Sequence, residues 1–442
     1  MPIPLTPQCR EALTERLATA LADVTVTKGQ FINRTSLLAV HESQKVLPAK
    51  GPETRQLRAL IDDDVMLEFV YGTLSHELQS QPYADTVGTR LADVPGYDDL
   101  TAVSARLVKA LEALPERYVF SIRLPGGLGR LFSGGIGIDL SPTVHVLHSE
   151  SPFLESLPRT TGDTDRDRRV HNLGLLGGGP KPWDGTYLVC VTEGFVGAFT
   201  DTFPRRFAED LFKSFCGLAL AFSLLKRSRS YTPYARSAGF LIHRQVGDAY
   251  ELFDESPLPN ASAEAYGDMD LNVTAVEGLS DTTFGSAITL LIYMTEAFGP
   301  SDTAARIRRA AQWYFDSECA DTPLLGFVQA MVCLEILYGD KAAAAKLGLN
   351  ELLKNRCAYA ISSDHAEREA ILKSFDEIYD VRSRIVHTGH LRLTGEERGH
   401  FLTLKRYCVQ ALLREIGLLK GKAATGAGPL GTAGQTKPKA PN

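Results

Sequence analysis

The chain has 442 residues, enough to bury two substantial hydrophobic cores, and 44% of its residues are hydrophobic. Its formal net charge of -6 excludes a chain-wide basic field, so any contact with nucleic acid has to be local. The seven cysteines form no C-x-x-C pair and are odd in number, which favours reduced thiols that pack in the interior.

The N-terminal sequence lacks the basic and apolar regions of a signal peptide. The longest apolar stretch, Phe215 to Leu225, is too short to span a bilayer. We therefore expect a cytoplasmic protein without a membrane partner.

The first 270 residues mix helical and strand patterns. Apolar residues at helical spacing predict helices over 8–23, 54–78, 100–114 and 203–226. Runs of β-branched and aromatic residues predict strands over 116–124, 144–147 and 186–191, and a hairpin of 239–244 with 249–253. Residues 158–181 are polar and glycine-rich, which predicts a long loop. We predict an α+β domain over 1–270, with the domain boundary in the proline- and glycine-containing stretch Glu255 to Asn272.

From Asp281 onward only helical patterns occur. The expected helices are 283–298, 303–317, 323–338, 342–358, 365–386 and 396–419. They predict an all-α bundle over 281–420. The remaining residues, 421–442, are dominated by Gly, Ala, Thr, Pro and Lys, which predicts a disordered tail.

One helix of this bundle carries an arginine where a leucine would be expected. Apolar residues mark one of its faces: Ile371, Phe375, Ile378 and Ile385. At about 100° per residue, Arg382 lies in the middle of that face. A buried, unpaired arginine is costly, so such a residue is paired, lies at an interface, or serves chemistry. Gly389 follows as a residue that can end the helix in the left-handed conformation.

His387 follows Arg382 in the last turn, where the helix dipole favours a protonated imidazole. The segment Tyr379 to His387 thereby resembles the R-x4-6-H motif of the HEPN superfamily, most closely its Apea-like branch, over about Ala304 to Leu419. The resemblance implies a HEPN-like helical bundle that dimerises and a ribonuclease that leaves 2′,3′-cyclic phosphate ends. It also implies a toxin or anti-phage defence effector, with Arg382 and His387 as catalytic residues.

The chemistry of metal-free RNA cleavage fits these two residue types. A base must remove the proton of the ribose 2′-hydroxyl, an acid must protonate the departing 5′-oxygen, and a positive group must stabilise the charge of the phosphorane. Histidine suits the first two tasks and the planar fork of arginine suits the third. Five residues correspond to about 140° around a helix, so one helix cannot bring the two side chains together. A second copy related by a two-fold axis would supply the missing group, which predicts a homodimer.

Two residues are expected to support this pair. Ser383 stands where active relatives often have Asn, Asp or His, and its hydroxyl can still hydrogen-bond a phosphate. Glu335 lies inside an apolar run and needs a partner, for which Arg382 is a candidate; the alternative is a carboxylate at the edge of the bundle.

Three further polar residues lie around the motif. Asp380 and Arg384 form an i, i+4 pair, which is more often a solvated ion pair than part of catalysis, although Arg384 is also a candidate for a phosphate contact. His390, just after Gly389, is a candidate second proton carrier.

No P-loop, dinucleotide-binding pattern or metal-ligand spacing is complete, so no cofactor and no metal are expected. We predict a metal-independent endoribonuclease with an RNA substrate. The role of residues 1–270 stays open, with a regulatory ligand or protein as candidate partners. One alternative is a non-catalytic HEPN module that binds RNA or a partner protein. Another is an enzyme in the N-terminal half, with the bundle serving dimerisation.

Overall fold

A computed structural model describes residues 2–125, 128, 137–159, 183–227, 238–272, 281–389 and 391–426. For residues 260, 261, 281–287, 388 and 422–426 it describes the backbone alone. The chain divides into two compact units. The N-terminal unit is Met1–Lys213 with Leu225–Ser280, and the helical unit is Ser214–Leu224 with Asp281–Asn442.

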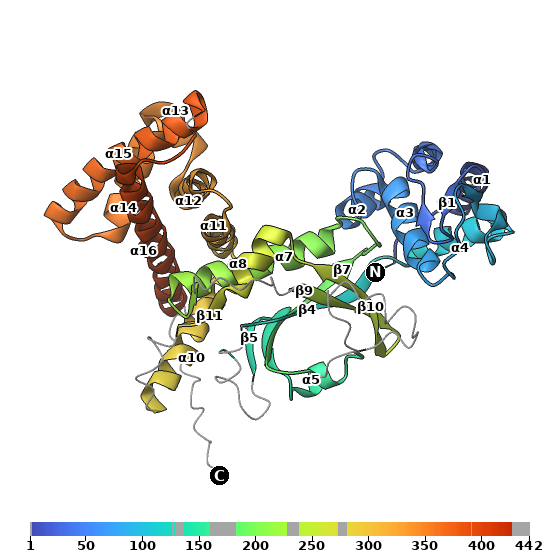
Figure 1. Cartoon of the computed structure of the whole chain (residues 1–442), viewed down its shortest axis with the longest axis horizontal. Coiled ribbons are helices and arrows are strands. Elements are labelled where there is room, and N and C mark those ends of the chain that lie inside the picture. The colour runs from blue at the N-terminus through green and yellow to red at the C-terminus, as the bar shows by residue number, and fades with distance from the viewer. Residues whose placement is uncertain are drawn as a thin grey trace, which may run out of the picture. The chain divides into compact units, whose positions relative to one another are not determined.

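The N-terminal unit begins with a helical layer around a small sheet (Figure 1). Its helices are α1 (Pro7–Leu21), the 3-10 helix η1 (Leu38–Val46), α2 (Pro52–Leu60), α3 (Val65–Leu78), the 3-10 helix η2 (Leu91–Asp93) and α4 (Leu100–Ala113). Strands β1 (Thr25–Thr27), β2 (Phe31–Ile32) and β3 (Thr89–Arg90) pair in the order β2-β1-β3. Leu13, Leu17 and Leu21 of α1 are fully buried, each with an exposed fraction of 0%.

A six-stranded antiparallel sheet completes this unit. Its strands are β4 (Glu116–Arg123), β5 (Gly137–Ser141), β6 (Val144–His148), β7 (Thr186–Gly194), β9 (Gly239–Val246) and β10 (Ala249–Pro257), in the order β10-β9-β4-β7-β6-β5. On one face, Phe120 and Phe240 pack with Phe212 of α7 (Phe203–Ala221). On the other face, Val119 and Val189 pack with Leu154 of α5 (Pro152–Glu155). The central strands are therefore covered on both sides.

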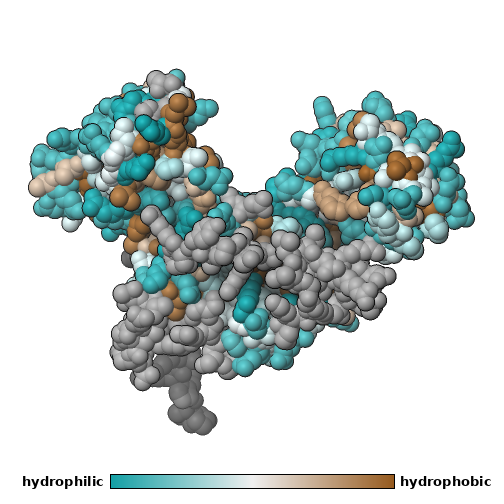
Figure 2. Space-filling view, in the orientation of Figure 1, coloured by the Kyte–Doolittle hydropathy of each residue, from teal (hydrophilic) through white to brown (hydrophobic). Residues whose placement is uncertain are grey.

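The helical unit contains the helices that the sequence predicts after Asp281. They are α10 (Asp281–Thr295), η4 (Glu296–Phe298), α11 (Asp302–Cys319), α12 (Pro323–Tyr338), α13 (Lys341–Leu347), α14 (Leu349–Ile361), α15 (His365–Thr388) and α16 (Gly395–Gly426). Figure 2 shows that the visible face of this unit is mostly hydrophilic, with hydrophobic patches over α12 and α13. Fully buried aromatic residues, Phe315, Phe327 and Phe375, form part of its core.

The broad expectation of an α+β part followed by a helical part is confirmed, while several element boundaries differ. Two predicted helices are each broken in two. The helix expected over 54–78 is interrupted before α3, where the Asp64 side chain accepts a hydrogen bond from the Leu67 amide at 3.4 Å. The helix expected over 342–358 is interrupted at Gly348, whose φ of +83° ends α13.

Other differences concern short strands and the domain boundary. The helix expected over 203–226 ends at Ala221 and is followed by β8 (Leu225–Arg227), which pairs with β11 (Met269–Leu271). The stretch 255–272, expected as the domain boundary, instead carries the end of β10, helix α8 (Asn260–Gly267) and β11, all within the N-terminal unit. Conversely, residues 214–224 of the N-terminal half belong to the helical unit.

Two expectations fall largely outside the described residues. Of the loop expected over 158–181, the part from residue 160 onward is outside the described residues. The tail is expected from residue 421, but α16 continues to Gly426. Residues from 427 onward are outside the described residues.

The cysteines lie mainly in the interior. Six of the seven are buried and Cys9 is half-buried, and all seven are free thiols. Within the part of the chain that the structure covers, no single helix is both long and apolar enough to cross a membrane. Helices α12 and α13 reach that length and composition only together, with a bend of 102° between them.

A close helix contact inside the helical unit gives a first prediction. A Cβ at Gly217 would lie 2.0 Å from the Ala311 carbonyl oxygen, which is backbone and cannot rotate away. We expect Gly217→Ala to destabilise the unit by about 2 kcal/mol or more, because the two helices have to separate. Gly399→Ala is the control, since nothing lies within 4 Å of its Cβ position. There we expect a gain of roughly 0.5 kcal/mol from helix propensity. Urea denaturation measures both, and equal stability of the two variants would contradict the packing.

A buried histidine on the sheet gives a pH prediction. His243 on β9 has an exposed fraction of 0%, and its Nε2 donates to the Pro158 carbonyl at 2.8 Å. Nδ1 is then the acceptor nitrogen, and it has no hydrogen-bond partner among the described residues. Burial lowers the pKa of His243 to about 4 from its ordinary 6.5. Between these pH values the unfolded chain binds the extra proton, so the contribution of His243 to stability is lost as the pH falls.

The variant His243→Gln keeps an N–H donor and removes the titrating group. We expect wild type to lose up to roughly 3 kcal/mol more than the variant between pH 6.5 and 4, as measured by urea denaturation across that range. Burial also raises the pKa of Glu255 to about 7, and this group increases the stability of the fold as the pH falls, opposite to His243. The effect of His243 is therefore measured as the difference between wild type and the variant. Parallel pH profiles for the two proteins would contradict a neutral His243 in the folded state.

Candidate active site

Helix α15 carries the motif, and local sequence sets both of its ends. Asp364 caps its start, because the side chain accepts a hydrogen bond from the Glu367 amide at 2.9 Å. Gly389 ends it in the left-handed conformation, with φ 64° and ψ 39°, as the sequence predicts. The buried face consists of Ile371, Phe375, Ile378 and Val381. Ile385, expected on that face, is only half-buried.

Polar contacts anchor the middle of α15 to two neighbouring helices. The Ser374 hydroxyl lies 2.6 Å from the Tyr407 hydroxyl of α16. The Asp376 carboxylate accepts from Lys354 at 3.1 Å and from Asn350 at 2.9 Å, both on α14. The backbone that carries Arg382 is therefore held on two sides.

Arg382 lies opposite Glu335 of α12. The distance from its Nη2 to Glu335 Oε1 is 3.5 Å, and each side chain has an exposed fraction of 23%. The Tyr379 ring centre lies 5.9 Å from the guanidinium carbon. Arg382 Nε is buried and has no hydrogen-bond acceptor among the described residues. Among the described residues, the guanidinium thus makes one long contact to a carboxylate, and its Nε–H has no acceptor.

The electrostatics of this pair do not favour the two charges strongly. Burial raises the pKa of Glu335, and the nearby Arg382 charge opposes that rise only in part. The free energy lost by removing the carboxylate from water therefore exceeds the free energy gained from the arginine at 3.5 Å. A phosphate oxygen would be a better partner for the guanidinium than the contact it has.

His387 lies on another side of the helix. Its side chain is exposed in the last turn, and no hydrogen-bond partner for it is found within the described part of the chain. Five residues separate it from Arg382, or about 140° around the axis, so the two groups diverge. Ser383, next to Arg382, is half-buried. The structure therefore does not bring the two motif residues of one chain together.

The remaining motif residues have different surroundings. Arg384 donates to Glu397 Oε1 of α16 at 2.8 Å, a partner that sequence spacing did not indicate. Asp380, expected as the partner of Arg384, is exposed. His390 lies outside the described residues.

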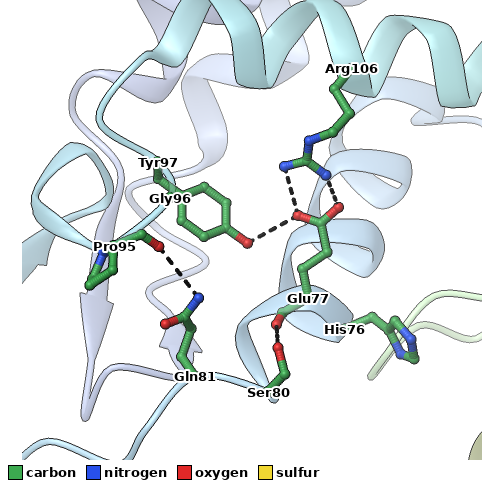
Figure 3. A pocket seen from close by; sticks show the side chains of 8 residues that line it. All are labelled: His76, Glu77, Ser80, Gln81, Pro95, Gly96, Tyr97 and Arg106. Carbon is green, nitrogen blue, oxygen red and sulfur yellow. Dashed lines mark hydrogen bonds and ion pairs between the residues drawn. The ribbon is translucent and has the colours of Figure 1, made fainter.

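A separate polar hollow lies in the N-terminal unit, with a volume of about 480 Å³ (Figure 3). The Glu77 carboxylate of α3 points to the Arg106 guanidinium of α4 and accepts from the Tyr97 hydroxyl at 3.0 Å. Burial, and then the Glu77 charge, raise the pKa of Tyr97. Sequence reasoning missed this cluster, since Glu77 and Arg106 lie on different helices and share no motif. Because the carboxylate is already bonded on both oxygens, the cluster joins the two helices.

Within the described ranges, no three His, Cys, Asp or Glu residues converge to form a metal site. Comparison with known proteins gives no relative for this chain. No protein-family model, no curated protein and no solved structure matches it.

Glu335 gives a prediction about stability. In Glu335→Gln the shape is kept and the charge is removed, so we expect the variant to be at least as stable as wild type at neutral pH. Because the pKa of Glu335 is raised, wild type loses stability as the pH rises through that pKa, and the variant lacks this loss. Denaturation at mildly acidic and at neutral pH measures the difference. Glu369→Gln, at an exposed position on the neighbouring helix α15, is the control. A loss above about 1 kcal/mol at neutral pH would mean that the ion pair outweighs burial.

Proposed function

We propose that the protein is a metal-independent endoribonuclease of HEPN type, with Arg382 and His387 as its catalytic residues. The observation that supports it best is the state of Arg382. Its guanidinium is partly buried, makes one contact of 3.5 Å to Glu335, and has a buried Nε without a described acceptor. A phosphate group would supply the acceptors that this arginine lacks.

The proposed reaction is attack of a ribose 2′-oxygen on the adjacent phosphorus. A bond from O2′ to phosphorus forms and the bond from phosphorus to O5′ breaks, leaving a 2′,3′-cyclic phosphate and a 5′-hydroxyl. One imidazole takes the 2′ proton and an imidazolium gives a proton to O5′. The Arg382 guanidinium stabilises the negative charge on the phosphorane oxygens. Ser383 can donate to the same phosphate.

The proposed site is shared by two copies of the chain. Arg382 and His387 diverge by about 140° on α15, so one copy offers an arginine and a histidine on different sides. A two-fold axis beside the helix would set the histidine of each copy near the arginine of the other. Val386 and Leu391, with exposed fractions of 48% and 91%, flank His387 in sequence and offer apolar surface to such a partner.

We further propose that the enzyme is a toxin or defence effector and that the N-terminal unit targets or restrains it. A ribonuclease that cleaves host RNA needs restraint, and the N-terminal unit is a separate body with its own cores. The alternative proposal is a non-catalytic module that binds RNA or a partner protein through the same residues.

The test is RNA cleavage by the full-length chain in excess EDTA, with analysis of the product ends. We expect wild type to leave 2′,3′-cyclic phosphate ends. We expect His387→Ala to lower the rate by roughly 10²- to 10⁴-fold, the usual effect of losing a general acid or base. Arg382→Lys keeps the charge and loses the planar fork, so we expect a loss of about tenfold or more.

His365→Ala is the matched control, because this histidine is 85% exposed in the first turn of the same helix. It should cleave like wild type. Equal cleavage by His387→Ala and His365→Ala would refute the site assignment. RNA binding without cleavage by wild type would favour the non-catalytic module instead.

A further inference from the structure

The last turn of α15 is held less firmly than the middle of the helix. Its middle is fixed by Ser374 and Asp376 and by buried apolar residues up to Val381. In the turn that follows, Val386 and His387 are exposed. Among the described side chains of residues 383–387, Arg384 is the one with a hydrogen bond to another helix. The position of His387 therefore depends on what Arg384 binds.

The partner of Arg384 is a buried carboxylate with a second task. Glu397 has an exposed fraction of 5%, and its Oε2 accepts from the Thr394 amide at 2.7 Å. The Thr394 hydroxyl accepts from the Glu397 amide at 3.3 Å, which completes a capping box at the start of α16. Oε1 of the same carboxylate accepts from Arg384 Nη2 at 2.8 Å. One carboxylate thus joins the end of α15 to the start of α16 across the connection between them.

We propose that Arg384 is a positioning residue that acts through Glu397 and Thr394 to hold the last turn of α15, and with it the His387 imidazole. The role in catalysis rests on the function proposed above, whereas the clamp itself does not. Arg384 lies three residues before His387, so an arginine fixed to α16 limits fraying of the turn between them. An imidazole that must meet a reacting proton at hydrogen-bond distance gains rate from such fixation.

The geometry favours this role over a direct phosphate contact by Arg384. Nη2 of Arg384 is already committed to a charge-assisted hydrogen bond of 2.8 Å with a carboxylate that is itself removed from water. Breaking it would leave the Glu397 charge buried without the arginine, which is costly. Arg382, whose one ion pair among the described residues is the contact of 3.5 Å to Glu335, is the better phosphate ligand of the two.

Hydrogen exchange on the full-length chain without RNA tests the clamp directly. We expect Arg384→Ala and Glu397→Gln each to speed exchange of the amides of residues 385–387 by roughly three- to tenfold. Glutamine keeps the capping acceptor for Thr394 but turns an N–H₂ donor towards Arg384, so it breaks the clamp alone. Amides of residues 371–378 should be unchanged. Arg398→Ala, an exposed arginine in the first turn of α16, is the control and should exchange like wild type.

Kinetics with RNA test the consequence for His387. We expect both clamp variants to lower kcat with little change in KM, and to leave the salt dependence of RNA binding unchanged. Arg384→Lys, which can still reach a carboxylate, should recover part of the rate. A salt slope reduced by about one in Arg384→Ala, or tighter RNA binding by Glu397→Gln, would identify Arg384 as a phosphate ligand and overturn the proposal.

Unchanged exchange in both clamp variants would also overturn it. If wild type cleaves no RNA while the last turn still loosens in both variants, the proposed function fails and the clamp stands. The two results are therefore separable.

Discussion

The partial burial of Arg382 beside Glu335 is the constraint on which the candidate site depends. A charged group withdrawn from water needs a partner, and the partner it has lies at 3.5 Å with a carboxylate whose own pKa is raised by burial. The pair is therefore held by the packing of α12 against α15 more than by its own attraction. An arginine held in this way keeps its donors aimed at one place, which is what an anion site needs.

Helix α15 differs in its surroundings between its middle and its last turn. The middle of α15, from Ile371 to Val381, is fixed by buried apolar residues and by contacts to α14 and α16. The last turn is exposed and is joined to α16 through Arg384 and Glu397. A rigid arginine and a solvent-facing histidine on different sides of one helix suit a site that two copies complete together.

The N-terminal unit is built around a sheet that is covered on both faces. The central residues of β4 and nearly all residues of β7 are buried, because α7 covers one face of the sheet and α5 the other. Its polar clusters, such as Glu77 with Arg106 and His243 with Pro158, are bonded inside the unit. These contacts stabilise the layers of the N-terminal unit.

The sequence by itself determined the helices with strong apolar period, the long strands, the left-handed Gly389 and the unusual place of Arg382, because these depend on local conformation and on which face is apolar. It also offered Arg382 as one candidate partner for Glu335, beside the alternative of a carboxylate at the edge of the bundle, and the structure shows the contact at 3.5 Å. Tertiary structure alone decided the remainder. The short strands β8 and β11 pair with each other. Residues 214–224 belong to the same compact unit as helices far along the chain. Arg384 donates to Glu397, whereas sequence spacing indicated Asp380. These contacts form between elements that are distant in the sequence, so the spacing of residues within one element does not predict them.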